Sequence, residues 1–134
     1  MPEEHAIQVC VRSVDDEERK RLERSRVRQI AVDPADVSRT LDVMSRSVRR
    51  GYVHVDLDVI DASELRANQY ALNGGPSVNS VAATIAAAGR CVPVDAAALT
   101  ALDPSIDSER AWDDRSAACV DGRVLSLTGE AIAT

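Results

Sequence analysis

The chain has 134 residues, a length that suits a single domain spanning residues 1–134. It carries no Phe, one Trp and two Tyr, so Val, Ala, Leu and Ile must fill a modest core that a partner surface would complete. The formal charge of -6 and the dispersed basic residues, nearly all arginine, argue against nucleic-acid binding, and no apolar run is long enough to span a membrane.

The cysteines and the first residues bear on location. Cys10, Cys91 and Cys119 are odd in number, widely spaced and without a CxxC pair. This pattern favours buried, reduced thiols over a disulfide framework or a zinc cluster. The start, Met1 to His5, is acidic and lacks the charged and apolar regions of a secretory signal. We therefore expect a cytoplasmic location.

The first half of the chain predicts two strands, each followed by a helix. The first strand is expected over residues 6–11, and the acids after it open a helix that runs to about Arg26. The second strand is expected over 29–32. Asp33 and Pro34 then open a helix that Gly51 ends. The apolar face of that helix recurs at helical spacing and comprises Val37, Leu41, Met44 and Val48.

The second half continues the alternation. A third strand is expected over residues 52–57, followed by a loop over 61–75 that is rich in Asn and Gly. Ser77 can cap a helix that Gly89 closes, a fourth strand lies within 91–102, and one or two helices follow in 108–134. Alternating strands and helices predict an α/β fold: a parallel sheet with helical crossovers. Function in such sheets gathers at the carboxyl ends of the strands.

The third strand delivers acidic side chains to that edge. Asp56 and Asp58 are two residues apart, so on a strand they face the same side and lie close enough to share a cation. Oxygen ligands suit Mg, Ca or Mn. The alternative is a strand end with solvated acids. His54 faces the same side, either as a third ligand or as a hydrogen-bonded neighbour, and Asp61 is better placed to bond loop amides.

These residues resemble the signature of the arginase/agmatinase (ureohydrolase) family. The run from Val55 to Ser63 and the later Gly74-Gly75 are similar to the stretch around that family's second pair of metal aspartates. Residues 11–15 resemble its Gly-hydrophobic-Arg-x-x-Asp stretch, and 101–105 its Glu-hydrophobic-Asn-Pro stretch. The resemblance covers residues 6–107 and implies the C-terminal half of the three-layer arginase-like fold.

The resemblance also implies roles and a chemistry. Asp56 and Asp58 would be metal ligands, His54 a further candidate ligand, and Asp15 would contact a substrate amine. The intact family uses two Mn ions to hydrolyse a carbon–nitrogen bond of a guanidino substrate. This sequence departs from the family pattern at Ala101, where the family has a Glu that contacts the guanidinium. The family's N-terminal half, with its remaining His and Asp ligands, has no counterpart in this sequence.

Three hypotheses about the function of the chain therefore stay open. The first is the C-terminal part of a ureohydrolase-like hydrolase, inactive as an isolated chain and completed by a missing N-terminal half. The second is a non-catalytic relative, kept for oligomerisation or regulation. The third is an unrelated metal- or phosphate-binding domain, because a helix N-terminus after Gly74-Gly75 can hold an anion. The expected partners are a guanidino small molecule and either a second copy or the missing half, with no nucleic acid and no membrane.

Overall fold

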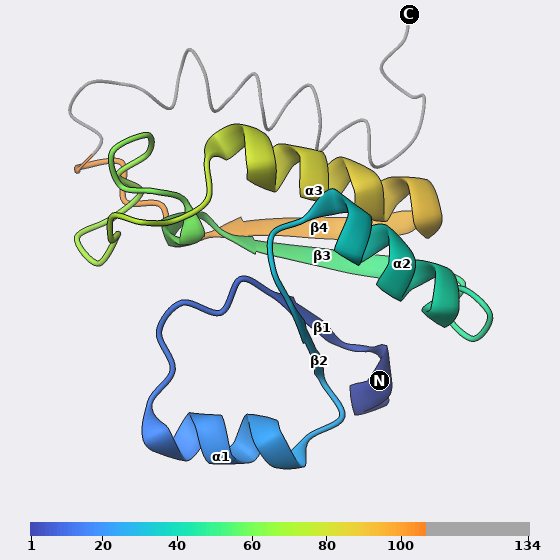
Figure 1. The fold of residues 1–134 in the computed structure, drawn as a ribbon. Helices are drawn as coiled ribbons and strands as arrows, with labels where there is room; N and C mark the ends of the chain where they lie inside the picture. The colour runs from blue at the N-terminus through green and yellow to red at the C-terminus, as the bar shows by residue number, and fades with distance from the viewer. Residues whose placement is uncertain (107–134) are drawn as a thin grey trace, which may run out of the picture.

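The structure is a computed structural model that describes residues 1–106 of the chain (Figure 1). Strands and helices alternate along the chain, as the sequence predicts. In chain order the elements are η1 (Glu3–His5), β1 (Ile7–Val9), α1 (Asp16–Arg24), β2 (Arg28–Ile30), α2 (Pro34–Met44), β3 (Gly51–Asp56), η2 (Leu57–Val59), α3 (Val78–Cys91) and β4 (Val94–Thr100).

The four strands form two parallel pairs, each closed by a helical crossover. β1 pairs with β2 across α1, and β3 pairs with β4 across α3. The predicted α/β class with parallel strands is confirmed. The register of the second pair sets Asp56 beside Thr100 and His54 beside Ala98, so both strands end at the same edge.

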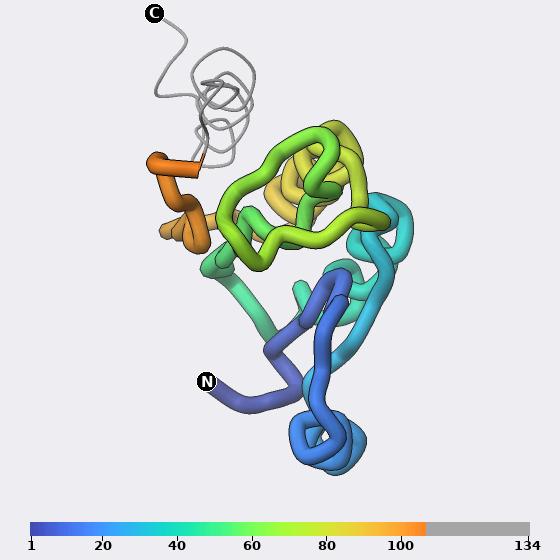
Figure 2. The backbone as a smooth tube through the Cα atoms, turned by 90° about the vertical axis from the view of Figure 1, so that its left-hand side faces the viewer, coloured from blue at the N-terminus to red at the C-terminus, as the bar shows by residue number. Residues whose placement is uncertain are grey.

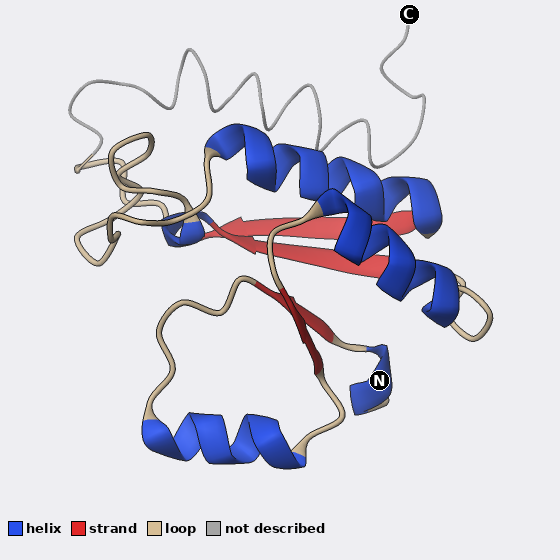
Figure 3. Cartoon of the chain, viewed as in Figure 1, coloured by secondary structure: helices blue, strands red, loops and turns tan. Residues whose placement is uncertain are grey.

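Helices lie on both sides of the strands. α2 and α3 pack against each other and cover one face of the β3–β4 pair, whereas α1 lies beyond β1 and β2 on the opposite side (Figures 1 and 2). Colouring by secondary structure shows the same layers and the long loop between η2 and α3 (Figure 3). This arrangement places the loop at the carboxyl ends of β3 and β4.

The core is aliphatic, as the composition requires. Its central cluster lies where β3 and the loop after it meet α3, and it comprises Val55, Leu57, Ile60, Leu65 and Ala67. Val78, Val81 and Ile85 of α3 pack against this cluster with Leu99 of β4. The core therefore sits directly behind the edge at which Asp56 and Asp58 lie.

Two helix ends differ from the sequence-based expectation. α2 ends at Met44, and Gly51 instead begins β3. α3 runs through Gly89 to Cys91, because the following Val92 is extended. A residue before proline is restricted to extended conformations, so Val92-Pro93 is the stop signal. The helices predicted within 108–134 lie outside the described residues.

The structure bears on two expectations from the sequence, one about membrane-spanning segments and one about the cysteines. Within residues 1–106, no helix is both long and apolar enough to cross a bilayer. Cys10 and Cys91 are free thiols, as expected, but both are half-buried rather than fully buried. Cys119 lies outside the described residues.

Candidate functional site

The two aspartates of the acidic strand come together where β3 ends. Asp56 is the last residue of β3, and Asp58 lies on the short helix η2 instead of continuing the strand. Partial burial raises the pKa of Asp56 above its usual range, and the charge of Asp58 and a hydrogen bond with its side chain raise that pKa further. The charge of His54 acts in the opposite direction. Asp58 therefore influences the ionisation of Asp56 at the end of β3, and the role of both residues as metal ligands stays a prediction.

Asn68 ties Asp58 to the end of the neighbouring strand. Its Nδ2 donates to Asp58 Oδ2 at 3.2 Å and to the backbone carbonyl oxygen of Ala101 at 2.8 Å. Ala101 has a left-handed backbone with φ of 63°, which turns the chain directly after β4. Asn68 thus holds the Asp58 carboxylate over the carboxyl end of the β3–β4 pair.

His54 makes a different contact from the ligand role considered above. Its Nε2 lies 2.8 Å from Thr100 Oγ1 on β4. Within residues 1–106, no three His, Cys, Asp or Glu side chains come close enough to hold a metal ion. Two carboxylates offer oxygen ligands to one divalent cation, but they do not fix two ions about 3.5–4 Å apart. The described residues therefore fit part of a two-metal ligand set.

Asp61 organises the loop that follows, as its position after the strand predicts. Its Oδ1 accepts from the backbone N of Ser63 at 2.8 Å and from Ser63 Oγ at 2.6 Å, and its Oδ2 accepts from Gly74 N at 2.7 Å. The Ser63 hydroxyl first, then the backbone N–H groups of Ser63 and Gly74, lower the pKa of Asp61. The carboxylate closes the loop from residue 61 to residue 74 and is not directed at Asp56.

Asp15 and Arg12 lie in the segment between β1 and α1. Asp15 is the N-cap of α1, and its Oδ1 accepts from Glu18 N at 2.8 Å. Its predicted contact with a substrate amine stays a prediction. Arg12 instead reaches the loop after β3 and donates to backbone carbonyls there, Val59 O at 3.1 Å among them. It joins the β1 end of the molecule to the acidic site.

The sequence did not identify Arg12, Asn68 or Thr100 as site residues. Arg12 lies 46 residues before Asp58, and Thr100 lies 46 residues after His54. Contacts over such separations depend on the strand register and the loop path. Only Arg12 had a signal, since it stands at the arginine of the Gly-hydrophobic-Arg-x-x-Asp stretch.

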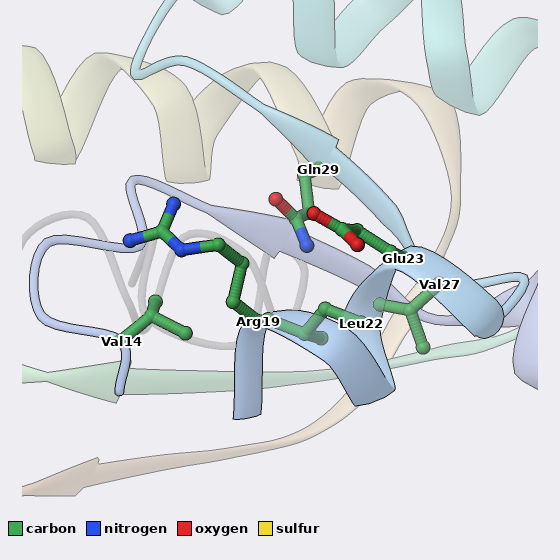
Figure 4. Close-up of a pocket in the computed structure, with 6 residues that line it drawn as sticks. All are labelled: Val14, Arg19, Leu22, Glu23, Val27 and Gln29. Atoms are coloured by element: carbon green, nitrogen blue, oxygen red, sulfur yellow. The ribbon is translucent and has the colours of Figure 1, made fainter. Parts of the chain in front are cut away.

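A pocket of about 340 Å³ lies elsewhere, between α1 and β2 (Figure 4). It has apolar and charged walls from α1, β2 and the segments flanking them, and it is lined by Val14, Arg19, Leu22, Glu23, Val27 and Gln29. None of the acidic residues at the end of β3 lines it. The pocket is therefore separate from the candidate site.

Comparison with known proteins gives one consistent family. The model of the arginase family matches residues 1–122. Arginase from Bacillus caldovelox is 18% identical with a TM-score of 0.80, over 98% of this chain and 45% of that one. Arginase from Helicobacter pylori is 14% identical with a TM-score of 0.84, over 96% of this chain and 44% of that one.

A third solved structure has a different named activity. Formimidoylglutamase from Bacillus subtilis is 19% identical with a TM-score of 0.81, over 94% of this chain and 42% of that one. The chain therefore spans less than half the length of these structures, which share its fold. No curated protein sequence matches the chain significantly.

Proposed function

Because the chain belongs to the arginase family, we propose that it supplies the carboxylate half of a metal-dependent hydrolase site for a carbon–nitrogen bond. The observation that carries this proposal is the placement of Asp56 at the carboxyl end of β3 and of Asp58 on η2 directly after it, where Asn68 holds the Asp58 carboxylate. Two carboxylates held this close repel each other when both are ionised, and a divalent cation relieves that repulsion. Mn²⁺ accepts such oxygen ligands.

The remaining ligands must come from beyond residues 1–106. Asp56 and Asp58 offer oxygen atoms, while His54 is engaged with Thr100. The related structures are more than twice as long as this chain. An N-terminal half like that of the longer related structures, docked at the carboxyl ends of β3 and β4, is the partner that we propose. Such a partner would also cover open strand edges, which invite pairing with another chain.

A guanidino compound is the proposed substrate class of the completed site. Two of the similar structures are arginases. When bound, the metal pair would supply an activated water. This chain's residues orient the ligands: Asn68 holds the Asp58 carboxylate, and Asp61 shapes the loop beside it. Ala101 contributes no carboxylate to a cationic substrate, so that contact would have to come from another residue.

Calorimetric titration with Mn²⁺ tests the carboxylate pair directly. We expect weak binding in the millimolar range by the wild-type chain, lost in Asp56→Ala and in Asp58→Ala. Asp95→Ala is the matched control, because Asp95 is exposed and pairs with Arg50 near the opposite end of β4. If the wild-type chain gives no heat of binding at millimolar Mn²⁺, and Asp56→Ala gives the same result, then Asp56 and Asp58 do not bind metal in the isolated chain.

A second candidate function rests on the incomplete ligand set. A non-catalytic member of the family, kept for assembly or regulation, would need no third ligand near Asp56 and Asp58. The observation in its favour is that no three-residue metal cluster forms within the described part of the chain. This candidate predicts no Mn²⁺ binding and a stable assembly in solution, so light scattering that finds a stable, soluble monomer would count against it.

A further inference from the structure

Arg12 connects two backbone segments that lie far from it in the sequence. Its Nη1 donates to the carbonyl oxygens of Asp58 at 3.3 Å and Val59 at 3.1 Å. Its Nη2 donates to the carbonyl oxygens of Leu72 at 2.9 Å and Asn73 at 2.8 Å. One guanidinium therefore spans the turn that carries Asp58 and the loop that leads into α3. We call these segments the carboxylate turn (residues 57–60) and the glycine loop (residues 72–75).

The acceptors explain why a guanidinium suits this position. The carbonyl oxygens at the end of the short helix η2 have no further helical N–H groups to pair with. The planar fork of arginine presents N–H groups on two nitrogen atoms in a fixed geometry, so it can serve two acceptor groups at once. A lysine ammonium is a single compact donor centre and would reach one group of carbonyls.

Gly75 shows independently how closely these segments approach. A Cβ atom at this position would lie 2.5 Å from Val59 O, 2.7 Å from Asp61 N and 2.8 Å from Arg12 Nη1. The backbone atoms in that group have no room to yield. The glycine loop therefore lies directly against the carboxylate turn and the guanidinium, with no side chain between them.

We propose that Arg12 is a positioning residue that holds the carboxylate turn against the glycine loop and so fixes Asp58 beside Asp56. The consequence for metal binding rests on the proposed function, whereas the mechanical coupling does not. Arg12 does not face the cation in this scheme. It acts through the backbone of Asp58, to which it bonds, and Asn68 completes the hold on the Asp58 side chain.

Two variants and one control test this proposal on the full chain. In Arg12→Lys, we expect amide hydrogen exchange to accelerate about tenfold or more in both the carboxylate turn and the glycine loop, since several hydrogen bonds to a charged group are lost. Gly75→Ala attacks the same junction from the other side and should loosen the same amides. Arg50→Lys is the matched control, because within residues 1–106 the side chain of Arg50 bonds only Asp95, at the surface. It should leave both segments unchanged.

The outcomes separate this inference from the proposed function. Unchanged exchange in Arg12→Lys, or acceleration spread evenly over β1 to β4, would overturn the coupling. Mn²⁺ affinity is measured on the same proteins, and we expect it to weaken about tenfold in Arg12→Lys. Loosened segments with unchanged Mn²⁺ affinity would overturn the positioning of Asp58. Loosened segments in a chain whose wild type binds no Mn²⁺ would support the coupling and refute the proposed function.

Discussion

Ala101 and Cys10 adopt a backbone conformation that side chains disfavour, and each does so directly after a strand. Their φ values are 63° and 58°, in the left-handed region that glycine occupies without strain. Ala101 follows β4 and presents its carbonyl oxygen to Asn68. Strained backbone of this kind is concentrated at functional sites. At Ala101 it turns the chain after β4 so that the carbonyl oxygen of this residue meets Asn68, which also bonds the Asp58 carboxylate.

Substitution of Ala101 measures this strain. Replacing an alanine in the left-handed region by glycine stabilises the folded state by about 1–2 kcal/mol. The greater conformational freedom of glycine in the unfolded chain offsets about 0.4–1 kcal/mol of that stabilisation. We expect Ala101→Gly to raise the free energy of unfolding by up to about 1.6 kcal/mol. Ala98→Gly, within β4, is the matched control and should lower it by about 0.5–1 kcal/mol. Urea denaturation measures the free energy of unfolding of both variants. An equal decrease in the two would contradict the proposal that the backbone at Ala101 is strained.

Asp61 gives the fold a defined dependence on pH. Hydrogen bonds from Ser63 and Gly74 lower the pKa of Asp61 in the folded chain, so the folded state favours the ionised carboxylate. The resulting stabilisation is present above the ordinary aspartate pKa of about 3.9 and is lost as pH falls through the lower folded value. We expect the difference in stability between wild type and Asp61→Asn to shrink below about pH 4.

Unfolding by urea at a series of pH values measures this effect. Ser63→Ala serves as the intermediate case, because it removes the largest single contribution to the lowered pKa of Asp61 and leaves the carboxylate in place. It should show a smaller pH dependence than the wild type. A stability difference between wild type and Asp61→Asn that stays constant from pH 3 to pH 7, a window chosen about the aspartate pKa, would show that the loop does not depend on the ionised form.

At the scale of elements, the sequence predicts the order well because strand and helix periodicity is a local property. All three α-helices begin where the sequence predicts, each at a side-chain cap: Asp15 accepts from Glu18 N, Asp33 from Ala35 N and Ser77 from Ser80 N. The helix C-termini are less predictable. α2 ends at Met44, where the Ser45 and Ser47 hydroxyls donate to the last helical carbonyls. Such bonds from side chains to nearby backbone groups compete with continuation of the helix. They leave no periodic pattern in the sequence from which the end of the helix could be predicted.

The sequence predicts only those features of the candidate site that arise between residues close together in the chain. The spacing of Asp56 and Asp58 places their carboxyl groups together, although η2 rather than a strand positions Asp58. The loop-closing role of Asp61 also follows from its place after the strand. The contacts of Arg12 and Thr100 depend on which loop crosses which strand end. These are tertiary facts, and neither periodicity nor capping chemistry contains them.

At the scale of the whole molecule, one face of the β3–β4 pair is covered and the other is open among the described residues. Val53 and Val55 face α3 and the core, whereas Tyr52, His54 and Asp56 alternate with them on the exposed face. Tyr52 is 64% exposed, and its strand neighbour Ala96 is also exposed. We therefore take this open face, with the exposed Tyr52 on it, as a candidate contact surface.

In a solution of this chain alone, the available partner for that face is a second copy. We therefore expect light scattering to show a concentration-dependent dimer, and Tyr52→Glu to shift the population to monomer because it places a charge in the contact. Tyr70→Glu is the matched control, since Tyr70 is 71% exposed but lies on the loop rather than on the sheet. It should associate like the wild type. Equal masses for both variants would show that the dimer contact does not involve this face. A wild-type chain that is monomeric at every concentration would contradict the dimer, and the open face would then be assigned to docking of the proposed N-terminal half.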